Sequence, residues 1–143
     1  MSTDTKTVKN ENAEIKDTKA AAPKVPRHKM STGILFVQAT YNNTKVLLAD
    51  SKGNAVAASS SGTLGFKGAK KGTPFAAAKV GELLGDKAKA MGVNEVDVVV
   101  SGVGAGRESS IRAFSSKGIG ILSITDKTPV PHNGPKPKKP RRV

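Results

Sequence analysis

The residues with the clearest chemical potential lie in a glycine-rich stretch at 101–108, SGVGAGRE, between an apolar run and an expected helix. Gly102, Gly104 and Gly106 allow a backbone to approach an anion, and the first N–H groups of a helix lack intrahelical partners. Arg107 adds a guanidinium that can bind a phosphate through two hydrogen bonds. The stretch therefore predicts an anion site, with a tight turn that binds no ligand as the alternative. It does not match a dinucleotide fingerprint, because Arg107 stands where that motif needs glycine.

A second glycine-rich stretch, at 62–72, brings three lysines to the start of another expected helix. Lys67, Lys70 and Lys71 can reach several phosphates, and Phe66 can stack on an unpaired base. For Phe66, packing against the core is an equally good interpretation. The stretch is not a P-loop, because no two glycines at the required spacing are followed by Lys and Ser or Thr.

Catalytic patterns are weak in this sequence. The chain has no cysteine, and its histidines, His28 and His132, lie outside the expected core. A metal-dependent nuclease on a mixed sheet needs several carboxylates that converge at strand ends, and the first expected strand offers only Gln38 in its interior. The carboxylates that could be considered are Asp50, Glu108 and Asp126. We therefore predict no catalytic residue, no metal site and no cofactor.

The charge distribution indicates a polyanionic partner. Among 143 residues, 24 Lys and Arg face 11 Asp and Glu, which gives a net charge of +13 and a pI of about 10.2. Residues 1–29 carry +3, residues 30–126 carry +4 and residues 127–143 carry +6. Such an excess is typical of proteins that neutralise phosphates. The apolar runs are short for a membrane helix, and the lack of cysteine fits a cytoplasmic location. We expect nucleic acid as partner, with no membrane and no small-molecule substrate.

The region 30–126 has the periodicity of a single α/β domain. The expected strands are 34–40, 44–50, 55–60, 96–101 and 119–125, and the expected helices are 74–91 and 107–117. The order βββαβαβ predicts a mixed five-stranded sheet, with an antiparallel meander first and parallel strands later. The valine-rich run at 96–101 predicts a strand covered on both faces. Asn42 and Asn43 predict a tight hairpin turn with positive φ.

The two ends of the chain lack this periodicity. Residues 1–29 are polar and predict a disordered basic arm. Residues 127–143 alternate prolines with cations and predict an extended basic tail that is also disordered in the free protein. The sequence thus divides into an arm at 1–29, a domain at 30–126 and a tail at 127–143.

Six motifs, read in order, resemble the bacterial-type small-subunit ribosomal protein eleven family. They are YNNT at 41–44, DSKGN at 50–54, GFKG at 65–68, TPFAA at 73–77, GAGRESSIRA at 104–113 and ITDKTPVPHNG at 124–134, followed by the basic end at 137–143. The likeness covers about 33–143. It implies a ribonuclease H-like topology without catalysis, a place on the platform of the small ribosomal subunit near the messenger exit side, and ribosomal RNA and neighbouring ribosomal proteins as partners.

The resemblance also implies a set of RNA-binding residues. They are Asn42, Asn43, Phe66, Lys67, Lys70, Lys71, Gly104, Gly106, Arg107, Arg112, His132, Asn133, Lys136, Lys138, Lys139, Arg141 and Arg142. Arg112 can instead pair with Glu108 on a helix surface. Family members commonly have Pro in place of Val103, which predicts a less rigid turn in this chain. They commonly have Arg in place of Lys67 and Lys70, which predicts single contacts to phosphates in the loop at 62–72. The competing functions are a metal-dependent nuclease and a free non-specific nucleic-acid-binding protein.

Overall fold

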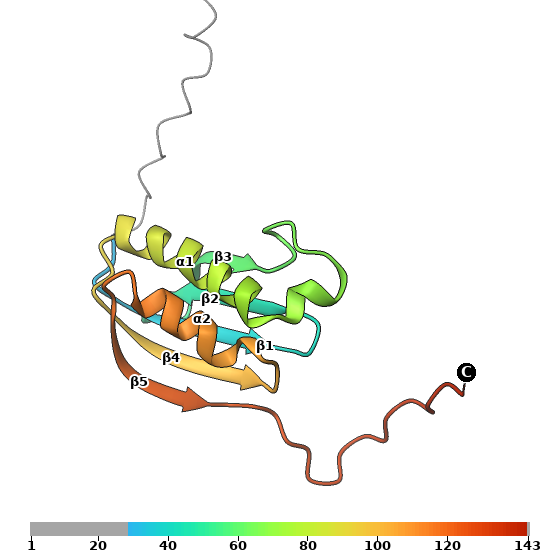
Figure 1. The fold of residues 1–143 in the computed structure, drawn as a ribbon. Helices are drawn as coiled ribbons and strands as arrows, with labels where there is room; N and C mark the ends of the chain where they lie inside the picture. The colour runs from blue at the N-terminus through green and yellow to red at the C-terminus, as the bar shows by residue number, and fades with distance from the viewer. Residues whose placement is uncertain (1–28, 143) are drawn as a thin grey trace, which may run out of the picture.

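Five strands and two helices form within residues 29–142, the part of the chain that the computed structural model describes (Figure 1). The elements are β1 (Thr32–Ala39), β2 (Thr44–Ala49), β3 (Ala55–Ser60), α1 (Pro74–Ala90), β4 (Glu95–Gly102), α2 (Gly106–Ser115) and β5 (Gly120–Asp126). A 3₁₀ helix over Gly68–Gly72 precedes α1. Every expected element is present and the single α/β domain is confirmed. Except for Lys29, the arm expected at 1–29 lies outside the described residues.

The strands form one mixed sheet in the order β3-β2-β1-β4-β5. β2 pairs antiparallel with both β1 and β3, whereas β4 pairs parallel with β1 and with β5. The antiparallel meander and the later parallel strands are therefore confirmed. Only β2 runs against the other four strands, which agrees with the ribonuclease H-like topology expected from the sequence.

Both helices lie on the same face of the sheet, so the prediction that β4 is covered on both faces is wrong (Figure 1). Val96, Val98 and Val100 are buried, but Asp97 is exposed and Val99 is only half-buried on the opposite face. The reason is topological. The connections from β3 to β4 and from β4 to β5 move across the sheet in the same direction, and crossovers of one hand then place both helices on one face.

The core lies between this face and the two helices. It contains Leu35 and Val37 from β1, Leu84 from α1, Val98 from β4 and Phe114 from α2, all at most 1 % exposed. The helices approach each other closely because α1 has glycine where α2 crosses it: a Cβ on Gly81 would collide with the Ser110 carbonyl, and one on Gly85 with Lys117. No described helix has the length and apolar character needed to cross a membrane.

The start of α1 follows the sequence signal for a helix N-terminus. Thr73 has an extended backbone, and its hydroxyl accepts a hydrogen bond from the Ala76 N–H at 3.3 Å. Pro74 occupies the first helical position, where its missing N–H costs nothing. These two residues set where the lysine-containing loop at 62–72, which we call the basic loop, ends and where α1 begins.

Candidate nucleic-acid interface

Most of the predicted RNA-binding residues gather at one end of the sheet. Four strands run in the same direction: β1, β3, β4 and β5. The segments that follow them therefore all leave from the same end of the sheet, which we call the carboxyl end; they are 40–43, 61–73, 103–105 and 127–142 (Figure 1). At the other end of the strands, which we call the opposite end, lie the turns at 50–54, 91–94 and 116–119.

The β1–β2 hairpin turn is stabilised by Thr40. Its hydroxyl donates to the Asn43 carbonyl at 3.1 Å and accepts from the Asn43 N–H at 3.0 Å. Neither Asn42 nor Asn43 has positive φ, so the expected turn geometry is wrong; among the described non-glycine residues only Asn133 has positive φ, at 60°. The two hydrogen bonds of Thr40 hold the turn, so no residue in it needs a positive φ. Tyr41 at the tip of the hairpin is exposed to solvent.

The basic loop lies directly against this hairpin. A Cβ on Gly72 would collide with the Tyr41 carbonyl, so the two segments contact each other through their backbones. Lys67 and Lys70 are exposed and Lys71 is half-buried. Within residues 29–142 none of these three lysines forms an ion pair. Their ammonium groups are therefore available to an external anion.

Phe66 does not pack against the core, which was one of the two expectations for it, whereas its stacking on an unpaired base stays a prediction. It is half-buried and packs edge-to-face on the ring of Phe75, with 6.1 Å between ring centroids and an interplanar angle of 83°. Phe75 itself is exposed. Phe66 therefore supports a second aromatic side chain at the surface.

The glycines of the 101–108 stretch pack inward. A Cβ on Gly104 would collide with the Thr40 carbonyl, and one on Gly106 would lie 2.8 Å from the Ala77 side chain and collide with the Thr44 hydroxyl. The Gly104 N–H donates to the Ala39 carbonyl at 2.9 Å, so it is not left for an anion. The physical reason proposed for these glycines is thus corrected: they bring α2 and its preceding turn against the β1–β2 hairpin and α1. Their contact with RNA stays a prediction.

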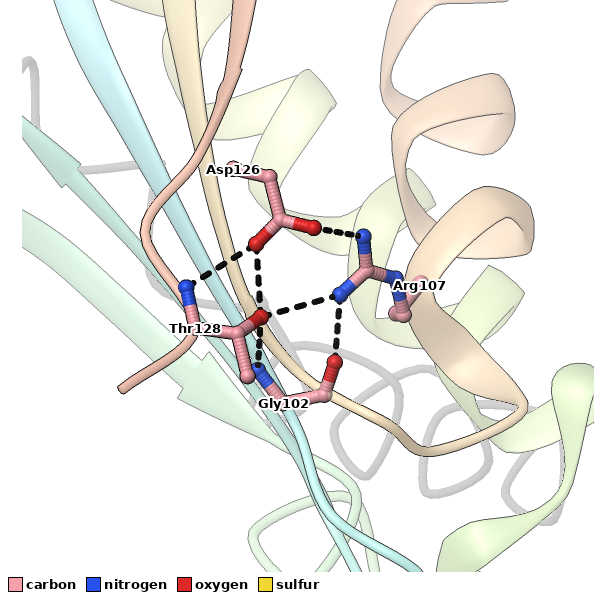
Figure 2. Close-up of polar contacts among 4 residues, drawn as sticks. All are labelled: Gly102, Arg107, Asp126 and Thr128. Carbon is pink, nitrogen blue, oxygen red and sulfur yellow. Dashed lines mark hydrogen bonds and ion pairs between the residues drawn. The ribbon is translucent and has the colours of Figure 1, made fainter. Parts of the chain in front are cut away.

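Arg107 is held by the protein itself (Figure 2). Its guanidinium donates to the Gly102 carbonyl, to the Thr128 hydroxyl at 3.3 Å and to the Asp126 carboxylate at 2.8 Å. Thr128 in turn donates to Asp126 through its N–H at 2.9 Å and its hydroxyl at 2.6 Å. We call Gly102, Arg107, Asp126 and Thr128 the tail latch, because they join the end of β4 and the start of α2 to the first residues of the tail.

The latch has a consequence for ionisation. Hydrogen bonds from the Thr128 hydroxyl, and then from Arg107, lower the pKa of Asp126 to about 2. The carboxylate is therefore ionised at neutral pH and keeps Arg107 engaged. A phosphate that binds Arg107 must use the 34 % of this side chain that is exposed.

Arg112 lies apart from the carboxyl-end segments, nearly two turns into α2. Its guanidinium pairs with the Glu108 carboxylate, and both side chains are exposed. The surface pair expected as the alternative is thus present. A contact between Arg112 and RNA stays a prediction.

The tail beyond the latch has neither helix nor strand. After Thr128 its residues to Arg142 are exposed, with bends at His132, Asn133 and Pro135 (Figure 1). Its remaining cations form no ion pair within the described residues; they are Lys136, Lys138, Lys139, Arg141 and Arg142. The chain therefore projects five cations away from the domain.

Comparisons with known proteins identify the family. Residues 33–142 match the family described as ribosomal protein S11. The chain belongs to the ribosomal protein S11 family. Three curated relatives are each called small ribosomal subunit protein uS11. The Solibacter usitatus protein is 47 % identical over 125 residues, which cover 87 % of this chain and 93 % of the relative.

The other two relatives are similar over comparable lengths. The Sphingopyxis alaskensis protein is 50 % identical over 117 residues, covering 82 % of this chain and 91 % of its own. The Rippkaea orientalis protein is 48 % identical over 126 residues, covering 88 % and 97 %. The family match includes the carboxyl-end segments and the described tail, so the resemblance read from six motifs is confirmed.

Sequence reasoning missed two features of this S11-family interface. Asp126 and Thr128 were part of a recognised motif, but nothing in their spacing indicated that Arg107, about twenty residues earlier, would bind them. Phe75 belongs to the TPFAA motif, and its place at the second position of a helix whose buried stripe begins at Ala76 is the signal that it lies outside that stripe. The described residues contain no group of three His, Asp or Glu side chains suited to a metal ion.

Proposed function

We propose that this protein is a structural component of the small ribosomal subunit that binds ribosomal RNA through its carboxyl end and its tail. Three loops form a rigid surface, and the tail extends from it. Neighbouring small-subunit ribosomal proteins are the further partners that this role requires, and the cytoplasmic ribosome is its location.

The observation that supports the proposal best is the convergence of cation-bearing segments at the carboxyl end. Lys67, Lys70 and Lys71 come from one loop and five further cations come from the tail, and none of them has a carboxylate partner in the described structure. Phosphate groups supply the anions that this surface lacks, and each contact releases counterions.

The rigid and extended parts contribute differently to binding. The basic loop and the 103–105 turn each contact the hairpin through backbone, so the loop lysines project from a packed backbone whose shape suits one folded RNA. The tail adds phosphate contacts along an extended chain. The tail latch determines where the tail leaves the domain, which makes Arg107 a positioning residue as well as a predicted phosphate contact.

Sedimentation of a tagged chain in sucrose gradients tests the proposal. A ribosomal component migrates with the small subunit and stays there at moderate salt. A free nucleic-acid-binding protein stays near the top of the gradient or spreads over all RNA-containing fractions, and this distribution would refute the proposal. The nuclease alternative predicts metal-dependent cleavage of the RNA in the same fractions.

A further inference from the structure

Two aromatic side chains are exposed at the carboxyl end, Tyr41 at the hairpin tip and Phe75 at the start of α1, and of these Phe75 stands beside the lysines of the basic loop. Phe75 is 64 % exposed, although it lies one residue before the buried stripe of α1 begins at Ala76. Phenylalanine is normally buried, because burial removes its apolar surface from water. A phenylalanine presented at a helix start fits a surface that contacts something else.

The surroundings of Phe75 limit what that partner can be. The Phe66 ring meets it edge-to-face at 6.1 Å, and the Lys79 ammonium lies 5.5 Å from its ring centroid. The loop that leads to it carries Lys67, Lys70 and Lys71. The nearby carboxylate of Glu82 is already bonded to Lys79 at 3.4 Å. An aromatic ring among cations suits a partner that is both planar and anionic.

We propose that Phe75 is a stacking platform for an unpaired nucleobase of RNA, supported by Phe66. The lysines of the basic loop bind the phosphates on either side of the stacked base. Every base has a π-face, so such stacking adds affinity with little dependence on sequence. The proposal rests on the proposed function and adds to it the residue that receives a base. It assigns Phe66 to support, because Phe66 is half-buried against the other ring.

The geometry favours RNA over an apolar protein partner. A protein segment that covers Phe75 would desolvate the Lys79–Glu82 ion pair, which is costly, and would bring no phosphates to the unpaired lysines of the basic loop. An RNA strand brings phosphates to these cations as its base reaches the ring. Pro74 and the Thr73 cap hold the start of α1 in one conformation, so the ring is presented without extra ordering of the backbone.

Tryptophan fluorescence provides a direct test, because the chain contains no tryptophan. Full-length Phe75→Trp is titrated with purified small-subunit ribosomal RNA, and we expect strong quenching as a base stacks on the indole. Leu122→Trp is the matched control, since Leu122 is 57 % exposed on β5 at the far edge of the sheet. Its fluorescence should change little over the same titration.

Affinity measurements on further variants complete the test. Phe75→Ala should bind the RNA about fivefold to 150-fold more weakly, and Phe75→Tyr should bind nearly as well as the parent chain. The slope of log affinity against log salt should not change in Phe75→Ala, because no charge is removed. Loss of the edge-to-face pair with Phe66 should lower the thermal unfolding midpoint of Phe75→Ala only slightly, whereas a purely structural role would lower it strongly and leave RNA affinity unchanged.

Two results would overturn the inference and separate it from the proposed function. If Phe75→Trp binds RNA without quenching, or Phe75→Ala binds as tightly as the parent, the ring does not stack on a base although RNA binding stands. If the parent chain does not bind the RNA at all, the proposed function fails and the inference fails with it.

Discussion

The two ends of the sheet use their charged residues in opposite ways. At the opposite end, the Asp50 carboxylate bonds to the backbone of its own turn: it accepts hydrogen bonds from the N–H groups of Lys52 at 2.8 Å and Asn54 at 3.0 Å. These bonds, the one from Asn54 most of all, lower the pKa of Asp50. Lys117 of the 116–119 turn pairs with Asp86 of α1 at 3.2 Å. At the carboxyl end, the loop lysines and the tail cations have no such partner in the described structure. Single lysines of the opposite end, such as Lys52 and Lys89, also form no ion pair in the described structure, so the guide to an interface is the clustering of unpaired charges in one loop and the tail.

The largest effect that this comparison predicts is on RNA affinity after removal of the tail. Deletion of 136–143 removes five cations. It should flatten the slope of log affinity against log salt by about 3 to 4, which corresponds to roughly a thousandfold weaker binding near 0.1 M salt. Filter binding at several salt concentrations measures both quantities. An unchanged slope would mean that the tail does not contact phosphates.

The next effect is on stability at the carboxyl end. Gly106→Val should lower the free energy of unfolding by about 2 to 3 kcal/mol, because the new side chain overlaps the Thr44 hydroxyl and Ala77. Ala105→Val is the matched control, since Ala105 is exposed and should change stability by at most about 0.5 kcal/mol. Urea unfolding followed by circular dichroism compares them. Equal stability of the two variants would show that the turn does not pack as described.

A smaller effect is expected from opening the tail latch. Arg107→Ala should weaken RNA binding by about two- to tenfold, because the first residues of the tail are then no longer held by the domain and must be ordered when RNA binds. The Lys127 N–H, which donates to the Val100 carbonyl at 2.8 Å, should then exchange with solvent faster. Glu108→Gln, which breaks only the exposed pair with Arg112, is the control and should leave this exchange unchanged. Unaltered exchange in Arg107→Ala would show that Arg107 does not position the tail.

The latch also predicts a pH dependence. The pKa of Asp126 is lowered from 3.8 to about 2, so its contribution to stability is fully present above about pH 4 and is lost as the pH falls toward 2. The urea midpoint of the parent chain should therefore exceed that of Asp126→Asn at neutral pH, and the difference should shrink between pH 4 and 2. A difference that stays constant over this range would exclude an ionised latch.

The smallest effect should come from charge at the opposite end. Lys89→Glu, at the C-terminal end of α1, should change RNA affinity by no more than about threefold, through long-range electrostatics that salt screens. Lys70→Glu makes the same change of charge in the basic loop and should cost about tenfold or more. Parallel titrations at two salt concentrations compare the pair. Equal losses would remove the distinction between the two ends.

Much of the fold could be predicted because its signals are local. Thr73 and Pro74 mark the start of α1, and alternating or continuous apolar residues mark the strands. The burial of β4 on a single face could not be read this way, because Val99 resembles its buried neighbours in sequence and differs only in what covers it. The positive φ predicted at Asn42 and Asn43 is wrong because hydrogen bonds of the Thr40 hydroxyl stabilise a turn that needs no left-handed residue.

In the candidate site, too, some features follow from local sequence and others depend on contacts that only the fold creates. Its location, in the basic loop, the 101–108 stretch and the tail, follows from composition and from motifs with a fixed order in the chain. The roles of individual side chains do not, because Arg107 acquires its partners from Asp126 and Thr128, and Phe66 acquires its partner from the next helix. The contacts of Arg107 join residues about twenty positions apart, and the contact of Phe66 joins a loop to the following helix, so neither follows from a local pattern.

By itself, the sequence determined the order and type of the elements, the cationic character of the tail and membership of the S11 family, since each depends on residue types at positions close in the chain. The tertiary structure alone decided that four segments meet at one end of the sheet, that both helices cover one face, and that Gly104 and Gly106 serve packing. The physical reason is that parallel strands bring distant segments to a common edge, and the contacts formed there, rather than local preference, determine which groups are satisfied internally and which are left for RNA.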